Sequence, residues 1–92
     1  MSDKKGPKCI YFAYVHARDR KILRRQAAFA TTTFKDGLVP TIGYVSDSFM
    51  VVSVTSEKPI DAMQVATFEE KVEKEAFANI LFCFQSDQPT YL

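Results

Sequence analysis

The segment LVPTIGYVSDSFMVVSVT, residues 38–55, decides the fold of this chain. Two runs rich in apolar and β-branched residues, 38–45 and 49–55, flank the short polar stretch 46–48. This pattern predicts a β-hairpin with a short loop. Pro40 cannot donate a ladder hydrogen bond, so it suits an edge strand or the start of a strand, whereas the second run is expected to be central.

Two further strands are predicted on either side of this hairpin. Residues 9–15 form an almost continuous aromatic and β-branched run, which favours a central strand buried on both faces. Residues 80–84 show the same buried-strand pattern. Before them, Thr67 and Glu70 have the spacing of a capping box, which predicts that a helix begins there. Whether residues 60–66 extend this helix stays open.

The segment 18–34 allows two interpretations. As a helix over 19–30, it places Leu23 and the small apolar residues after it on one stripe, and Asp19 could cap its start. As a strand, it is favoured by the three threonines at 31–33. We favour the helix. The element order is then strand, helix, strand, strand, helix, strand.

This order predicts an α+β fold of the ferredoxin-like βαββαβ kind: an antiparallel sheet of about four strands with two helices on one face. If 18–34 is a strand, the alternative is an antiparallel meander with one helix. A chain of 92 residues has room for one domain, 1–92. We expect residues 1–8 to be a flexible basic tail and 86–92 a mostly polar C-terminal tail.

The length and composition also exclude several classes of protein. No apolar run reaches the roughly 18 residues that a membrane span needs, and residues 1–8 lead into no apolar signal-peptide core. Two cysteines and one histidine exclude a disulfide framework and a Cys/His zinc site of the usual four-ligand kind. We therefore expect no membrane partner, no cofactor and no metal.

The net charge of +1 hides a division along the chain. Residues 1–25 hold eight basic residues against two acidic ones, a balance of +6, and residues 26–92 hold four against nine, a balance of −5. Such an asymmetry creates local fields that the net charge conceals. The basic segment could face phosphates or an acidic protein surface. The alternative is that both segments are solvated faces that keep the domain soluble.

No arrangement of residue types supports catalysis. Cys9 and His16 are seven positions apart on one predicted strand, so they point to opposite faces and cannot form a nucleophile–base pair. Both Cys9 and Cys83 lie in apolar runs, where burial raises the thiol pKa and lowers reactivity. Three scattered glycines cannot build a phosphate-binding loop. We predict that the chain is not an enzyme and takes no small-molecule substrate.

The arginine cluster is the best candidate for function, because the guanidinium fork suits phosphate and carboxylate. On a helix, Arg18, Lys21 and Arg25 align in one row, and Arg20 and Arg24 form a second row beside it. An RNA-stacking platform on the first strand is not expected, because Tyr11 and Tyr14 lie on opposite sides of it. The predicted residues for binding a partner or nucleic acid are Arg18, Arg20, Lys21, Arg24 and Arg25, with His16 beside them.

The opening stretch KCIYFAYVHARDR, residues 8–20, together with the chain length, resembles small phage-encoded anti-CRISPR proteins directed at the type I-F RNA-guided surveillance complex. The resemblance implies a non-catalytic inhibitor in the cytoplasm of an infected bacterial host. It implies docking on the backbone and tail subunits of the crRNA-bound Cas complex, with possible contact to the crRNA itself, and a block of target-DNA binding.

Two other functions remain open from the sequence. One is a stand-alone nucleic-acid-binding or regulatory module, which would bind free RNA or DNA in a salt-sensitive way. The other is a small homodimeric structural domain with its interface at the hairpin edge near Pro40 or at the strand 80–84.

Overall fold

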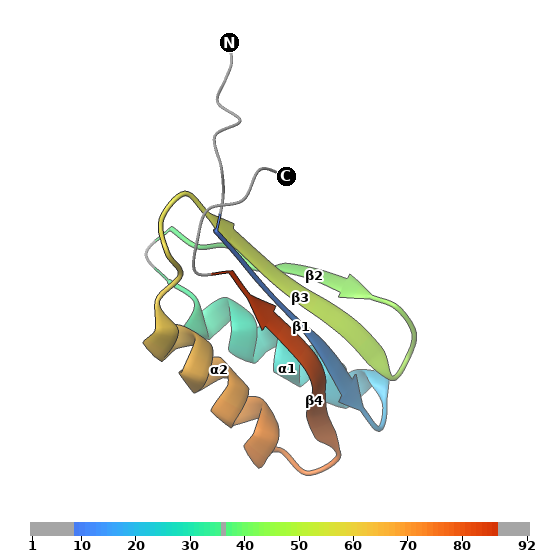
Figure 1. Cartoon of the computed structure of the whole chain (residues 1–92). Helices are drawn as coiled ribbons and strands as arrows, with labels where there is room; N and C mark the ends of the chain where they lie inside the picture. Colours follow the sequence, from blue (N-terminus) through green and yellow to red (C-terminus); the bar gives the residue numbers. More distant parts are fainter. Residues whose placement is uncertain (1–8, 36, 87–92) are drawn as a thin grey trace.

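The computed structural model describes residues 9–35 and 37–86, and it confirms the predicted ferredoxin-like α+β fold (Figure 1). A four-stranded antiparallel sheet carries two helices, and the elements follow the predicted order. The predicted tail 1–8 and all of the predicted tail 86–92 except Ser86 lie outside the described residues. The elements are β1 (Cys9–Ala17), α1 (Arg20–Thr33), β2 (Thr41–Tyr44), β3 (Phe49–Ser56), α2 (Ala62–Lys74) and β4 (Ala78–Gln85).

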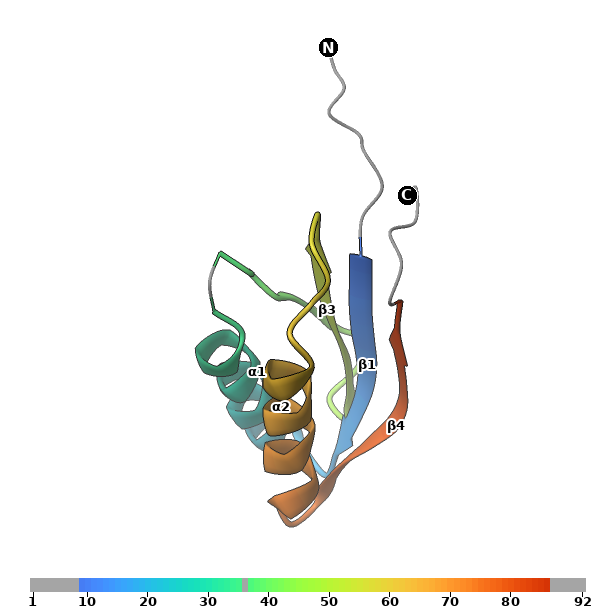
Figure 2. The same ribbon diagram turned by 60° about the vertical axis from the view of Figure 1, so that its left-hand side comes forward.

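The sheet has the strand order β2-β3-β1-β4, and every neighbouring pair is antiparallel. β3 lies between β2 and β1, so the second strand of the hairpin is central, as predicted. β2 lies at the edge and starts directly after Pro40, where a missing N–H removes no ladder bond. In Figure 2, both helices lie on the same side of the sheet, and the other side carries no helix from the described part of the chain.

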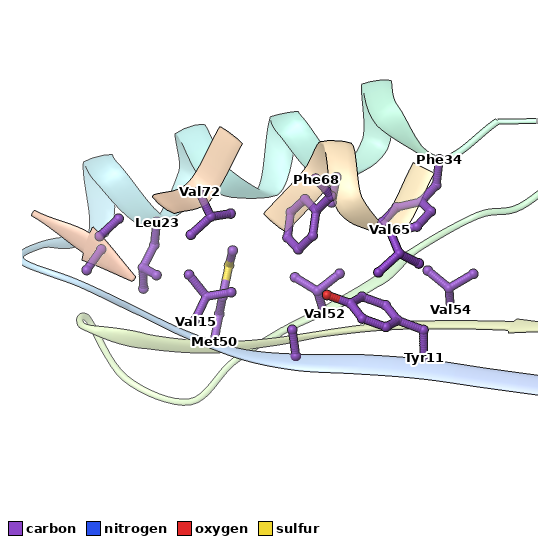
Figure 3. Packing of buried hydrophobic residues seen from close by; sticks show 14 of the residues in the cluster. Tyr11, Val15, Leu23, Phe34, Met50, Val52, Val54, Val65, Phe68 and Val72 are labelled. Atoms are coloured by element: carbon purple, nitrogen blue, oxygen red, sulfur yellow. The ribbon is translucent and has the colours of Figure 1, made fainter. Parts of the chain in front are cut away.

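The hydrophobic core fills the space between the helices and the sheet (Figure 3). Alternate residues of the central strands point toward the helices, among them Tyr11 and Val15 of β1 and Met50 of β3, all buried. Leu23 of α1 and Phe68 of α2 are completely buried against them. Because strand side chains alternate between faces, the remaining residues of these strands lie on the uncovered side.

β1 is central, but it is buried on one face only, which corrects the prediction of a strand buried on both faces. The prediction of a buried strand at 80–84 is wrong for the same reason: β4 is an edge strand, and Leu81, Phe82 and Phe84 are exposed. A continuous apolar run does not reveal whether one or two layers cover a strand. Here one helical layer covers the sheet, so the run supplies both a core face and an apolar outer face.

The helix predicted over 19–30 is confirmed and extends to Thr33, which excludes the strand alternative for this segment. Asp19 is the N-cap, and its carboxylate accepts a hydrogen bond from the backbone N–H of Ile22 at 3.1 Å. Leu23 and Ala30 on the predicted stripe are fully buried. The amphipathic stripe and the cap therefore outweigh the strand preference of the threonines at the C-terminal end.

The question left open for residues 60–66 is answered by the structure: they belong in part to the second helix, and Thr67 is not its N-cap. α2 begins at Ala62 and is capped by Asp61, whose carboxylate accepts from the backbone N–H of Met63 at 2.9 Å. Thr67 lies inside the helix, and its hydroxyl donates to the carbonyl of Met63 at 2.8 Å. The earlier cap is favoured because the turn that it adds buries Val65 against the core.

Tyr11 ties the sheet to α2 through a part-buried hydrogen bond. Its hydroxyl donates to Oε2 of Glu69 at 2.8 Å, although the two residues are 58 positions apart. Burial, followed by the hydrogen bond to Glu69 and the charge of that carboxylate, raises the pKa of Tyr11 far above its ordinary value of about 10.

We expect the free energy of unfolding to fall as the pH rises above about 10, the pKa of an unfolded tyrosine. Below that pH the Tyr11 phenol is protonated in both states. Above it, the unfolded chain loses the proton while the folded chain keeps it, so ionisation favours unfolding. The slope from Tyr11 approaches about 1.4 kcal/mol per pH unit. Urea titrations of the wild type and Tyr11→Phe across this range check it: the variant should lose this part of the slope, and identical slopes would contradict the assignment.

Candidate partner-binding site

A groove of about 740 Å³ lies where the end of β1 meets the start of α1 and the turn between α2 and β4. It opens to solvent and holds four basic and three acidic residues. We call it the basic groove. Its lining residues are Arg18, Asp19, Arg20, Lys21, Ile22, Arg25, Asp47, Glu75, Ala76 and Phe77.

Arg18 is held in the groove by Phe77. Its backbone N–H donates to the carbonyl of Phe77 at 2.8 Å, and its guanidinium carbon lies 4.1 Å from the centre of the Phe77 ring. Phe77 has a φ of 69°, a left-handed conformation that disfavours a non-glycine residue by about 1–2 kcal/mol. Arg18 also lies 3.6 Å from the carboxylate of Asp19. A guanidinium has five N–H donors, so Arg18 keeps donors that neither the ring nor Asp19 uses.

Arg20 repeats this arrangement on the other side of the groove. Its guanidinium carbon lies 4.7 Å from the centre of the Tyr44 ring, and its Nη2 lies 3.2 Å from Oδ1 of Asp47. The Asp47 side chain is 86% exposed, so this ion pair is in contact with water. Arg20 Nε is buried and has no hydrogen-bond partner among the described residues. The buried Nε is out of reach of an external acceptor, but a guanidinium has five N–H donors, and those of the Nη atoms that Asp47 does not use are left for a further acceptor.

Arg25 has a different role, because its partner is fixed by a second bond. Its Nη1 donates to Oε1 of Glu75 at 2.8 Å, and the same oxygen accepts from Nε2 of the fully buried Gln26 at 3.2 Å. This cluster joins α1 to the end of α2. Arg25 thus stabilises the fold at the groove, whereas Arg18 and Arg20 can exchange their exposed ion pairs for contacts with a partner.

The predicted separation of basic and acidic surfaces is incomplete. Three of the four arginines lie beside a carboxylate of the protein, and Glu75, which follows the acidic helix, lies inside the basic groove. Lys21 and Arg24 are exposed, and no described carboxylate lies within ion-pair distance of either. Arg24 does not line the groove. The structure therefore brings together Arg18, Arg20, Lys21 and Arg25 of the predicted set.

His16, the sixth predicted residue, lies apart from the groove. It is on the uncovered side of β1, where its ring centre lies 4.9 Å from that of Phe49. Its Nδ1 lies 3.3 Å from Oδ1 of Asn79. Side chains alternate between the two faces of a strand, and the next residue, Ala17, is buried on the core side. His16 therefore points away from the groove that the following residues line.

Sequence reasoning missed an aromatic surface on the uncovered side of the sheet. The expectation that Tyr11 and Tyr14 lie on opposite sides is confirmed, but Phe12 shares the side of Tyr14. The rings of Phe82 and Phe84 on β4 lie 5.9 Å and 5.5 Å from that of Phe12. The available signal was the spacing of two between aromatic residues in each strand, which places both on one face.

We call this surface the open face. It is defined by the strand register, because residues paired across strands share a face. Its residues are Ile10, Phe12, Tyr14 and His16 of β1, Thr41 and Gly43 of β2, Phe49, Val51, Ser53 and Thr55 of β3, and Asn79, Phe82 and Phe84 of β4.

The residues considered for catalysis do not come together. Cys9 is buried on the core side of β1 and His16 lies on the open face. Cys83 is exposed rather than buried as predicted. Partial burial nevertheless raises the pKa of the Cys83 thiol, and Glu69 raises it further. Within residues 9–35 and 37–86, no three His, Cys, Asp or Glu side chains are grouped so that they could hold a metal ion.

No protein-family model matches the sequence, and no curated protein aligns with it significantly. In the described part of the chain, neither helix has the length and apolar character that crossing a bilayer requires.

Proposed function

We propose that this protein is a non-catalytic inhibitor that binds a crRNA-guided type I-F surveillance complex and blocks binding or hybridisation of its target DNA. The observation that carries the proposal is the basic groove, in which two arginines are stacked on aromatic rings and still have donors for a further acceptor. The partner contacted by the groove is guide-RNA phosphate or an acidic surface of a backbone or tail subunit. The sequence resemblance over residues 8–20 selects this class of complex.

The ion pairs inside the groove do not prevent such binding. Exposed ion pairs contribute only about 0.2–1 kcal/mol, so a phosphate can replace Asp19 or Asp47 at little expense. A guanidinium stacked on Phe77 or Tyr44 is already ordered and loses less rotamer entropy when it forms a bidentate contact. Lys21 adds a positive charge that no described carboxylate offsets.

The acidic helix offers a second contact of opposite sign. Glu70 and Glu73 of α2 are exposed, and Oε2 of Glu73 accepts a long hydrogen bond from the backbone N–H of Ile80 at 3.4 Å. Glu69 and Glu75 are engaged by Tyr11 and Arg25. In RNA-guided complexes the heteroduplex lies in a positively charged channel. The exposed glutamates would meet Lys or Arg side chains of that channel, in the cytoplasm of the infected bacterial cell.

A competition assay tests this function. Purified crRNA-loaded type I-F complex is incubated with the protein and then with labelled target DNA, and bound DNA is measured by gel shift. We expect bound DNA to fall to background at about one to a few protein molecules per complex, as in stoichiometric occlusion. Heat-unfolded protein is the control. Unchanged DNA binding at saturating protein would overturn the proposal.

The second candidate, a stand-alone nucleic-acid-binding module, is favoured by the exposed rings of Phe82 and Phe84, which lie beside the half-buried ring of Phe12. It predicts salt-sensitive binding to free single-stranded RNA or DNA. The inhibitor predicts little affinity for free nucleic acid, because the charge of +6 on residues 1–25 is offset by −5 on residues 26–92. Fluorescence anisotropy with a labelled oligonucleotide separates the two functions.

A further inference from the structure

The open face carries no charged side chain among its described residues, apart from the titratable ring of His16. All the remaining residues are aromatic, aliphatic, or small and polar. The exposed fractions of Phe82 and Phe84 are 52% and 45%, so large apolar groups face water on this side. An exposed apolar face bordered by polar residues is typical of an interaction surface.

The surface of the open face is uneven, with one raised region and one hollow. Phe12, Phe82 and Phe84 form a ridge of neighbouring rings over β1 and β4. Toward the β2–β3 loop, a hollow of about 210 Å³ is lined by Tyr14, Val45, Phe49 and Leu81. A cavity of about 150 Å³ is enough to hold a benzene ring. The hollow can therefore receive one phenylalanine side chain.

We propose that the open face binds a second copy of this chain and forms a two-fold symmetric dimer. In this dimer the two open faces pack against each other, and the two-fold axis lies between the sheets and runs perpendicular to the strands. Rotation about this axis places the ridge of each copy over the hollow of the other. Each ridge-and-hollow contact is then made twice, as an isologous interface requires. Two sheets that pack in this way lie about 10 Å apart, with their side chains interdigitated.

The size of the face fits this assignment. The four strands hold 9, 4, 8 and 8 residues. At about 3.3 Å per residue and about 4.8 Å between strands, they give about 460 Å² of flat area per copy, or about 920 Å² for the pair. This flat area is just below the lower limit of about 1,000 Å² for a specific interface, and the uneven surface of the side chains adds to it.

The absence of charge selects protein over nucleic acid as the occupant. A strand of RNA or DNA needs cations beside its phosphates, and the basic residues of the groove lie beyond the end of β1 rather than on the open face. The ridge and hollow on one face further select a copy of the same chain, because each provides what the other needs. Dimerisation leaves both basic grooves accessible, so this inference does not depend on the proposed function.

Sedimentation velocity on the full chain tests the dimer. We expect the wild type to sediment as a dimer at about 100 µM and to do so equally at low and high salt, since no ion pairs form the interface. Phe82→Glu should weaken the dimer by about 100-fold or more, because it would bury an unpaired carboxylate. Met63→Glu, an equivalent change at a 74% exposed position on α2, is the control and should remain dimeric.

A mixing experiment tests the arrangement and remains informative if a single variant fails to form a dimer for other reasons. Phe82→Glu changes the ridge and Phe49→Lys changes the hollow, so each should be monomeric alone. In a mixture, one contact becomes a Glu–Lys pair and the other is wild type, so heterodimers should form. Far-UV circular dichroism establishes that both variants are folded, and Phe84→Glu, on the same ridge, replaces Phe82→Glu if that variant is not. A monomeric wild type would overturn the proposal, as would a mixture of folded variants without heterodimers.

Displacement of the dimer by a single-stranded oligonucleotide would instead assign the face to nucleic acid.

Discussion

Phe68→Ala should lower the free energy of unfolding by about 3–5 kcal/mol, because it removes a fully buried ring and leaves a cavity. The ring of Phe68 lies edge-on to Tyr11 at 6.5 Å and tilted against Phe34 at 5.7 Å. It therefore joins α2 both to the sheet and to the segment that follows α1 (Figure 3). Small domains have total stabilities of about 5–15 kcal/mol, so this variant is expected to lie near the limit of folding.

Urea unfolding followed by circular dichroism measures this effect. Met63→Ala is the matched control, since Met63 lies on the same helix and is 74% exposed. Its midpoint should stay within the range of ordinary surface substitutions, about 0.5 kcal/mol. Equal midpoints for Phe68→Ala and Met63→Ala would show that the packing of α2 contributes little to stability.

The double variant Arg18→Ala, Arg20→Ala tests the proposed contact of the basic groove. It should weaken binding to the proposed partner, the crRNA-loaded type I-F complex, by about 100-fold or more, because hydrogen bonds to charged groups contribute about 1.5–3 kcal/mol each. It should also reduce the dependence of affinity on salt, in proportion to the number of phosphates or carboxylates that the two guanidinium groups bind. Affinity is measured by biolayer interferometry over a series of salt concentrations.

The control for this prediction removes two charges outside the groove. Lys58→Ala, Lys74→Ala changes the net charge by the same amount at exposed positions that do not line the basic groove. It should leave affinity nearly unchanged. If both double variants bind like the wild type with the same salt slope, the basic groove is not the contact surface. If both lose affinity equally, general charge rather than the groove drives binding.

The fold could be predicted because its local signals agree with one another. The hairpin at 38–55 combines β-branched runs with a polar turn, and Asp19 precedes an amphipathic stripe. The start of α2 was missed because Thr67 and Asp61 both have capping side chains, and only tertiary burial of Val65 decides between them. Local patterns specify which elements form better than where each begins.

The site was harder to predict because it depends on pairs that are distant in sequence. Glu75 lies 50 positions from Arg25, and nothing in the pattern of either segment indicates that they meet. The ring partners of Arg18 and Arg20 likewise come from the turn that precedes β4 and from β2. The open face could have been anticipated from the alternation of Phe12 and Tyr14. That no helix from the described residues packs on it could not be anticipated, because this depends on both helices lying on the same side of the sheet.

The irregularity in the pairing of β1 with β4, between Tyr14 and Val15, bears on how this chain could polymerise. A foreign strand that adds to the outer edge of β4 must follow the same break, so a straight template is available only in short pieces. At the opposite edge, β2 has four residues and follows a proline. Growth of fibres by successive strand addition is thus hindered at both edges of the sheet. Association through other surfaces would give oligomers of fixed size instead of fibres.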